Sequence, residues 1–235
     1  MTDPVPVVLV PGLICSPRFY QTQVPALWQF GPVTVADHTR DESMAAIAHR
    51  ILASAPSRFA LAGHSMGGYI AFEIMRKAPE RVVRLALLDT SARPDAPEQT
   101  ERRRSQIALA QSGRFAEVPD LLLPLLVHPT RKDDASLRQI VRQMADDNGP
   151  DAFVRQQTAI IARPDSRPTL AAIRCPTLVV VGDSDALTPP DRAAEIADGI
   201  PGARLVTIPT CGHMCAIEQR EAVTTAMVNW MRGNS

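Results

Sequence analysis

One stretch, residues 59–68 (FALAGHSMGG), constrains the fold of this chain more than any other. Its first four residues are apolar, as in a buried parallel strand, and residues 69–77 that follow have helical spacing. The polar residues between the strand and the helix must therefore form a tight corner with Ser65 at its apex. Gly63 and Gly67 leave room beside that apex, so we expect the Ser65 hydroxyl to stand at the carboxyl end of the sheet, facing the positive end of the helix.

The Gly-x-Ser-x-Gly pattern alone leaves two roles open for this serine. A serine can also cap a helix after a glycine turn, with no catalytic role. A nucleophilic serine needs partners, because its hydroxyl reacts poorly at neutral pH without a histidine base and a carboxylate that fixes the tautomer of that histidine. The rest of the chain must therefore supply these two partners.

Strand-like and helix-like segments alternate on both sides of a long helical stretch. Apolar, β-branched runs predict strands at residues 5–10, 33–36, 59–62, 81–88, 177–181 and 205–208. Helical spacing predicts helices at residues 21–28, 41–55, 69–77, 189–198 and 218–231, and, in a stretch without strand-like runs, at 99–111, 115–126, 134–146 and 151–162. This order predicts an α/β fold with a mostly parallel open sheet, covered by helices on both faces. Residues 1–90 and 175–235 would form the core, and residues 91–174 a helical cap inserted in it.

Composition narrows the possible partners. At 235 residues and 45% hydrophobic composition, the chain suits one domain with an insertion. Basic and acidic residues number 25 each, so there is no basic field to gather nucleic acid or hold an anionic membrane. The first apolar run follows no basic region and is too short to span a bilayer, so we expect a cytoplasmic protein without stable membrane association. The four irregularly spaced cysteines are expected to be reduced thiols.

Candidate partners for Ser65 follow the last two predicted strands, in the expected chain order of serine, acid and histidine. His213 lies directly after the last strand and is the best base, with an ordinary loop histidine as the alternative. Asp185 stands a few residues beyond the preceding strand, where a side chain could reach the histidine from a loop. It is favoured over Asp183, which more simply anchors the turn, and over Asp89, which ends the strand after the serine helix.

Two backbone N–H groups are expected to stabilise the oxyanion that forms when the serine attacks. The N–H of Met66, directly after the serine, is one of them. The other is expected from the loop after the first strand, where Leu13 follows Pro11 and Gly12. The predicted site consists of three side chains and two backbone groups, and it requires no metal and no cofactor.

Five segments, VVLVPGL, GHSMGG, LLDTSA, PTLVVVGDSDALTPP and CGHM, together resemble the α/β-hydrolase family along nearly the whole chain. The resemblance implies that the residues at the family's triad and oxyanion positions are Ser65, Asp185 and His213, and Leu13 and Met66. It also implies that the insertion is the family's helical cap. One departure is that a Pro-Gly pair replaces the usual His-Gly before the oxyanion residue, which affects how that loop is braced.

Within this family, a serine at the turn argues against epoxide hydrolases and haloalkane dehalogenases, which resemble this layout but use aspartate. The segments LLDTSARPD and PTLVVVGDSDALTPP are most similar to small carboxylesterases and 3-oxoadipate enol-lactonase. The resemblance implies a serine hydrolase that cleaves a small carboxylic ester or lactone through an acyl-enzyme. The alternatives are a carbon–carbon bond hydrolase or perhydrolase with the same triad, and a non-catalytic module that uses the cap pocket as a receptor. The oligomeric state is left open.

Four weaker signals have simpler structural explanations. The two cysteines that flank His213 lack the second ligand pair expected of a metal site. The run at residues 121–127 (LLLPLLV) could be a membrane-seeking lid, but it more simply packs against the core of the protein. His128 and the arginines at residues 102–104 are most simply solvent-facing, with substrate contact and carboxylate binding as the respective alternatives.

Overall fold

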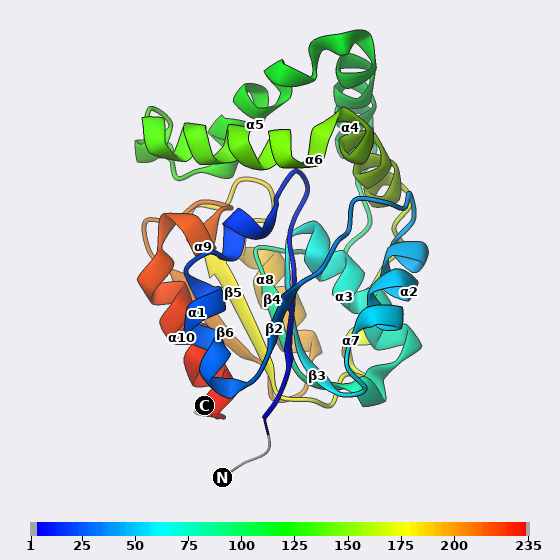
Figure 1. The fold of residues 1–235 in the computed structure, drawn as a ribbon, viewed down its shortest axis with the longest axis vertical. Helices are drawn as coiled ribbons and strands as arrows, with labels where there is room; N and C mark the ends of the chain where they lie inside the picture. The colour runs from blue at the N-terminus through cyan, green and yellow to red at the C-terminus, as the bar shows by residue number, and fades with distance from the viewer. Residues whose placement is uncertain (1–3, 234–235) are drawn as a thin grey trace.

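The structure, a computed structural model, describes residues 4–233. Six strands form one sheet in the order β2-β1-β3-β4-β5-β6, and every neighbouring pair is parallel (Figure 1). The strands are β1 (Val7–Val10), β2 (Val33–Val35), β3 (Phe59–His64), β4 (Val82–Leu88), β5 (Thr177–Gly182) and β6 (Arg204–Ile208). The predicted open parallel sheet is therefore confirmed.

Helices cover both faces of the sheet. One face carries α1 (Gln23–Leu27), α9 (Cys215–Glu218) and α10 (Arg220–Arg232). The other carries α2 (Met44–Ser54), α3 (Met66–Lys77), α7 (Arg167–Leu170) and α8 (Pro190–Gly199). This arrangement follows from the strands, because successive side chains of a strand point to opposite faces and both faces are buried here.

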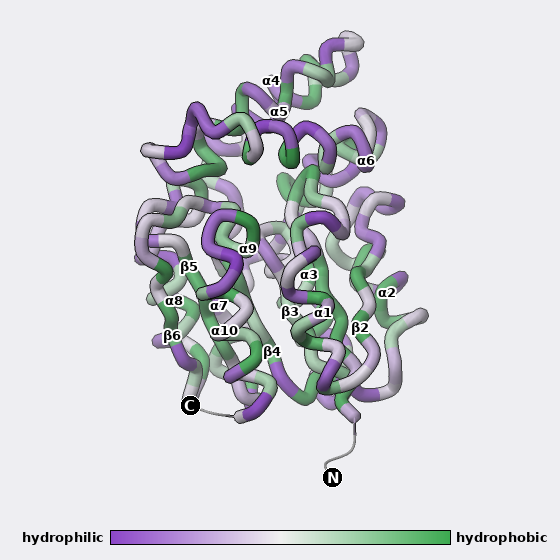
Figure 2. Tube along the Cα trace, turned by 60° about the vertical axis from the view of Figure 1, so that its left-hand side comes forward, coloured by the Kyte–Doolittle hydropathy of each residue, from purple (hydrophilic) through white to green (hydrophobic). Residues whose placement is uncertain are grey.

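Strand β1 illustrates this alternation. Val7 and Leu9 pack in the hydrophobic cluster that includes residues of α1 and α10, whereas Val8 and Val10 pack in the cluster that includes residues of α2, α3 and α8. Figure 2 shows hydrophobic residues concentrated along the strands and the adjoining turns of helices, with hydrophilic residues prominent on the helices farthest from the sheet. The core therefore consists of two apolar layers, one on each side of the sheet.

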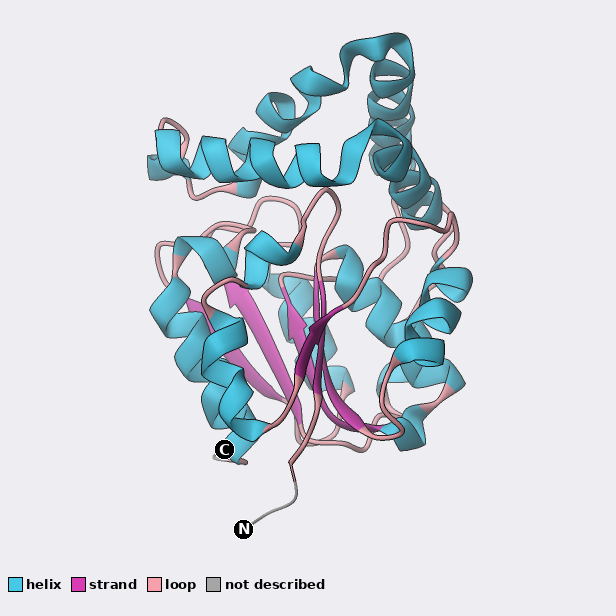
Figure 3. Cartoon of the chain, in the orientation of Figure 1, coloured by secondary structure: helices cyan, strands magenta, loops and turns pink. Residues whose placement is uncertain are grey.

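Between β4 and β5 the chain forms α4 (Pro97–Leu109), α5 (Val118–Leu126) and α6 (Ala135–Ile161), which lie beyond the carboxyl ends of the strands (Figure 3). Helix α6 is interrupted at Gly149, whose φ of 78° and ψ of 168° are not helical, so its two halves match the two helices predicted there. The division of the chain into a core and an inserted cap, with the limits given above, stays a prediction. Within residues 4–233, no helix combines the length and apolarity needed to cross a membrane.

Three helical predictions differ from the structure. Helix α3 begins at Met66 rather than at residue 69, directly after the apex serine. The helix predicted at residues 218–231 corresponds to α10, which begins only at Arg220 because Gln219 has a φ of −126° and a ψ of 58°; the short α9 before it was not predicted. Helix α7 was not predicted, since its four residues are too few to show helical spacing.

The register of the strands brings the candidate residues to one edge of the sheet. Val10 of β1 is opposite Gly63 of β3, so the loop after β1 emerges beside Ser65. Gly182 of β5 is opposite Ile208 of β6, so the loops that carry the acid and the histidine also emerge together. Strand β1 lies between β2 and β3, where the strand order reverses, and ligands of open α/β sheets bind at such a reversal.

Candidate active site

Ser65 occupies a strained turn between β3 and α3. Its φ of 50° and ψ of −112° lie in a region that residues with a side chain rarely adopt. Backbone contacts hold this conformation: the Ser65 N–H donates to the carbonyl of Leu88 at 2.9 Å, and the Ser65 carbonyl accepts from the N–H of Gly68 at 2.9 Å and from Thr90 Oγ1 at 2.8 Å. The surrounding structure therefore stabilises a backbone conformation that costs on the order of 1–3 kcal/mol.

The glycines on either side of this turn leave no room for a side chain. A Cβ atom at Gly63 would lie 2.2 Å from the carbonyl oxygen of Gly67, and one at Gly67 would lie 2.1 Å from the carbonyl oxygen of Val10. Both distances are far below van der Waals contact. The close approach of α3 to β1 and β3, which places the helix start beneath Ser65, thus requires glycine at both positions.

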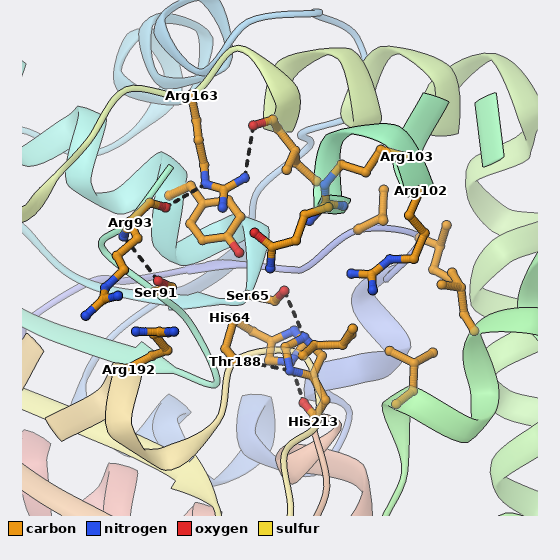
Figure 4. Close-up of a pocket in the computed structure, with 18 of the residues that line it drawn as sticks. His64, Ser65, Ser91, Arg93, Arg102, Arg103, Arg163, Thr188, Arg192 and His213 are labelled. Atoms are coloured by element: carbon orange, nitrogen blue, oxygen red, sulfur yellow. Dashed lines mark hydrogen bonds between the residues drawn. The ribbon is translucent and has the colours of Figure 1, made fainter. Parts of the chain in front are cut away.

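The three side chains that the sequence analysis singled out form one hydrogen-bonded row, of which Figure 4 shows Ser65 and His213. His213 lies on the loop between β6 and α9, and its Nε2 is 2.9 Å from Ser65 Oγ. On the other side of the ring, Nδ1 is 2.8 Å from Asp185 Oδ2. Asp185 is held in turn by the N–H groups of Leu187, at 2.8 Å, and Thr188, at 3.0 Å, and by the hydroxyl of Thr188, at 2.8 Å. The carboxylate and the imidazole are both buried.

The two competing aspartates have other contacts. Asp183 accepts hydrogen bonds from the N–H groups of Thr210, at 2.9 Å, and Cys211, at 3.1 Å. It therefore ties the loop after β5 to the loop that carries the histidine, whereas the sequence analysis expected it to anchor its own turn. Asp89 is fully buried and accepts from the N–H of Gly182 at 2.9 Å. The carboxylate that contacts His213 is thus that of Asp185.

Burial and charge set the protonation states around the row. Burial lowers the pKa of His213, but the charge and the hydrogen bond of Asp185 outweigh burial and raise this pKa above its ordinary value. Burial likewise opposes ionisation of Asp185, yet the charge of His213 and its hydrogen bond bring the pKa of Asp185 below its ordinary value. Burial, with the charge of Asp185, raises the pKa of Asp89 to about 8. Asp185 is therefore the carboxylate that stays ionised at neutral pH.

The loop after β1 contains Leu13, half-buried beside the candidate nucleophile, and Ile14, whose φ of 53° marks a tight turn. Two side chains from distant parts of the chain brace it. His38 Nε2 donates to the carbonyl of Gly12 at 2.8 Å, and Gln156 of α6 accepts from the N–H of Ile14 at 3.2 Å. The Pro-Gly pair is therefore braced from outside the loop. The Met66 N–H, in the first turn of α3, has no acceptor within the helix.

Two buried polar side chains that the sequence analysis did not single out hold the histidine loop. Glu218 Oε1 accepts from the N–H of Gly212 at 3.0 Å, and Oε2 accepts from the N–H of His128 at 2.7 Å. His64 Nε2 donates to the carbonyl of His213 at 2.8 Å, and burial lowers the pKa of His64 to about 3, so this ring stays neutral. No local pattern marks these contacts, since the residues that share them are far apart in the sequence.

A cavity of about 220 Å³ lies between Ser65 and the helices above the sheet. Part of its wall is apolar, with Leu122, Leu126 and Ile160 among its lining residues. Five arginines also line it: Arg93, Arg102, Arg103, Arg163 and Arg192. Among residues 4–233, no aspartate or glutamate lines this cavity. The cavity thus combines apolar contacts with an excess of positive groups.

The weaker signals have mixed outcomes. The solvent-facing interpretation is wrong for Arg103, which is largely buried against Asp95, and incomplete for Arg102, which lines the cavity. Most of the run at residues 121–127 packs inward, with Leu122, Leu123, Leu126 and Val127 buried. His128 contacts Thr130 and is not among the residues that line the cavity. In the part of the chain that the structure describes, no group of His, Cys, Asp and Glu side chains is arranged to hold a metal ion.

Comparison with known proteins identifies the family. The family model described as alpha/beta hydrolase fold matches residues 6–219. A carbamate hydrolase, so named provisionally, from Azorhizobium caulinodans is 32% identical over 88% of this chain and 84% of its own length. A provisionally named non-heme bromoperoxidase from Mycobacterium tuberculosis is 32% identical over 75% of this chain and 68% of its own.

Among solved structures, a thermophilic esterase from Thermogutta terrifontis with malate bound superposes with a TM-score of 0.88. It is 31% identical, and the match covers 98% of this chain and 90% of that one. These proteins share a fold and carry names of different reactions, so they indicate a class of enzyme rather than one substrate. The chain belongs to the α/β-hydrolase fold family and is an enzyme of the hydrolase class.

Proposed function

We propose that this hydrolase cleaves a small carboxylic ester or lactone through an acyl-enzyme, with Ser65 as nucleophile, His213 as base and Asp185 as the acid that orients the histidine. The observation that carries the proposal is the unbroken row of hydrogen bonds from Asp185 Oδ2 through both ring nitrogens to Ser65 Oγ. The strained turn adds support, because strain of this kind is maintained where a side chain must be held for chemistry.

The steps follow from the contacts. As Ser65 Oγ attacks the carbonyl carbon, His213 Nε2 accepts its proton, and Asp185 keeps Nδ1 protonated and stabilises the imidazolium. The negative charge that develops on the carbonyl oxygen is stabilised by the N–H groups of Leu13 and Met66. The imidazolium then returns the proton to the leaving alkoxide, and water repeats the sequence on the acyl-enzyme. In a lactone the alkoxide stays attached to the acyl group, so the first step opens the ring.

The direct test replaces Ser65 by alanine and measures turnover of p-nitrophenyl acetate and of a panel of small lactones. Turnover should fall to the rate without enzyme, while the circular dichroism spectrum and melting temperature stay close to those of the wild type. Mass spectrometry after treatment with a p-nitrophenyl phosphonate should show one adduct on the wild type and none on the variant. Ser54→Ala, on the outer end of α2, is the matched control and should keep both activity and labelling. Wild-type turnover in Ser65→Ala would refute the proposal.

Perhydrolysis on the same triad is the second candidate, favoured by the relative that is provisionally named a bromoperoxidase. In this reaction hydrogen peroxide, in place of water, attacks the acyl-enzyme and releases a peracid, which oxidises bromide. Bromination of monochlorodimedone with peroxide and acetate would detect it. Bromination rates comparable to the rate of ester hydrolysis would favour this candidate. Bromination that persists in Ser65→Ala would show that the reaction does not use the triad. Hydrolysis of carbon–carbon bonds stays a prediction that no contact in the cavity singles out.

A further inference from the structure

We propose that the substrate carries a carboxylate, and that Arg102 binds this carboxylate on the cap side of the cavity while the ester or lactone carbonyl lies at Ser65. This inference rests on the proposed hydrolysis at Ser65 and specifies its substrate. It follows from which of the five cavity arginines already have a partner, and from the donors that surround the one that has none.

Three of the arginines pair with carboxylates of the protein. Arg93 forms two hydrogen bonds of 2.9 Å with the carboxylate of Glu195. Arg103 and Arg163 share the buried carboxylate of Asp95. A shared carboxylate neutralises only one of two guanidinium groups, so this side of the cavity keeps a positive charge even where each arginine is paired.

Arg192 has a weaker partner, since Asp191 lies 3.2 Å away with a side chain that is 63% exposed. Arg102 differs from the other four, because within residues 4–233 its guanidinium has neither a hydrogen bond nor an ion pair. Figure 4 shows this group directed into the same cavity as the hydroxyl of Ser65. An arginine whose charge is unpaired adds little to stability through that charge, so a function in binding explains its orientation better than a function in folding.

The residues beside Arg102 on α4 also offer donors. Gln99 and Gln106, three residues before and four after it, lie on the same helix face and line the same cavity. The side-chain oxygen of Gln99 accepts from the N–H of Ala96 at 2.9 Å, and that of Gln106 accepts from Gln157 at 2.7 Å. Each amide oxygen thus has a donor from the protein, whereas within residues 4–233 neither NH₂ group has an acceptor. This face of α4 therefore offers two NH₂ donors beside the guanidinium of Arg102.

A carboxylate fits these donors. It accepts hydrogen bonds through both oxygens and donates none, and its planar shape matches the fork of a guanidinium. The arrangement also separates the two ends of the substrate, because α4 lies above the sheet edge and the triad lies on the loops below it (Figure 1). The anionic end is thereby kept away from Asp185, whose negative charge must act on His213.

Two esters that differ only at the far end test this inference: monomethyl glutarate, which ends in a carboxylate, and methyl pentanoate, which ends in a methyl group. Release of acid is followed in a pH-stat, and the measured quantity is the ratio of the two kcat/KM values. The wild type should favour the glutarate ester. Arg102→Gln should lower the ratio by about 10- to 100-fold, the usual range for loss of a hydrogen-bonded charge partner, mainly through KM. Arg102→Lys keeps the positive charge but loses the forked geometry of the guanidinium, so its ratio of kcat/KM values should lie between those of the wild type and Arg102→Gln.

Arg104→Gln is the matched control, because Arg104 lies on the same helix, is exposed and is not among the residues that line the cavity. It should leave the ratio unchanged. A wild type that favours methyl pentanoate, or a ratio that responds equally to Arg102→Gln and Arg104→Gln, would overturn the inference.

Binding separates this inference from the proposed function. If the wild type hydrolyses neither ester, the proposed ester hydrolysis is contradicted. Calorimetric titration of glutarate into the Ser65→Ala protein still measures carboxylate binding at Arg102. Affinity should fall by the same factor when Arg102→Gln is added to that variant. Glutarate that fails to bind, or that binds equally to both, counts against the carboxylate site whatever the outcome for esters.

Discussion

Replacement of Asp185 by asparagine exchanges one oxygen for an NH₂ group next to His213 and leaves the shape of the side chain unchanged. The asparagine oxygen can still accept from the N–H groups of Leu187 and Thr188, which contact Oδ1 at 2.8 and 3.0 Å. The NH₂ group then takes the place of Oδ2, 2.8 Å from His213 Nδ1. Since this group can only donate, Nδ1 must give up its proton and act as the acceptor.

The consequence for the reaction lies on the other side of the ring. With Nδ1 unprotonated, the proton of a neutral His213 moves to Nε2, which is 2.9 Å from Ser65 Oγ and must be free to accept the serine proton. The variant also lacks the charge that stabilises the imidazolium in the transition state. The same exchange in serine proteases lowers kcat by about 10⁴. We therefore expect kcat to fall by about 10³- to 10⁴-fold, equivalent to about 4–5.5 kcal/mol.

The assay is hydrolysis of p-nitrophenyl acetate at neutral pH, combined with thermal unfolding. The melting temperature should change little, because the asparagine keeps both backbone contacts and the Thr188 hydroxyl, 2.8 Å from the position of Oδ2, can accept from the new NH₂ group. Asp183→Asn is the matched control, since Asp183 contacts the histidine loop without contacting the ring, and it should cost less than about tenfold. A loss below about tenfold in Asp185→Asn, or an equal loss in both variants, would refute the assigned role of Asp185.

Three further predictions follow from protonation and packing. Because the pKa of His213 is raised, kcat/KM for a neutral ester should fall as the pH drops, with a midpoint above about 6.5 in the pH–rate profile; a lower midpoint contradicts this. Buried Asp89, with a pKa of about 8, keeps a proton that the unfolded chain releases near pH 4, so folding stability attributable to it is lost as the pH rises from about 4 to about 8. The stability of Asp89→Asn relative to the wild type should therefore increase as the pH rises from about 4 to about 8. Urea unfolding midpoints of both proteins at these two pH values would show it. A difference in midpoint that is the same at both pH values would contradict the prediction. Gly67→Ala should destabilise the protein by about 3 kcal/mol or more, because its Cβ would lie 2.1 Å from the Val10 carbonyl oxygen; a melting temperature equal to that of the wild type would contradict this.

The parts of the fold that could be predicted from the sequence depend on local patterns. Apolar runs identified all six strands, and the turn at Ser65 required small residues within a few positions of the apex. The preference for Asp185 over Asp183 came from the distance that a loop must cover: Asp185 contacts the ring of His213, whereas Asp183 contacts only the backbone of the loop that carries it, and the catalytic role of Asp185 stays a prediction. Each of these inferences needed only a short segment and the fold class.

Contacts between distant segments could not be predicted in this way. Gln156 and Ile14 are separated by 142 residues, and Glu218 reaches back by 90 residues to the N–H of His128. Neither pair leaves a periodic pattern in the sequence, since each contact joins a single side chain to a backbone group in a distant segment. The bracing of the loop after β1 therefore appeared only with the tertiary structure.

The arginines at residues 102–104 show why substrate chemistry was hardest to predict. Consecutive residues of a helix point about 100° apart, so three adjacent arginines must face three directions, and the rotation of α4 decides which one enters the cavity. A buried apolar stripe usually sets that rotation, but α4 has no fully buried residue, and Leu109 at its end is only partly buried against the core. Polar contacts of Arg103 with Asp95 and Gln157 therefore contribute to the rotation. The direction of Arg102, and with it the proposed selection of a carboxylate, thus depends in part on its neighbour's hydrogen bonds.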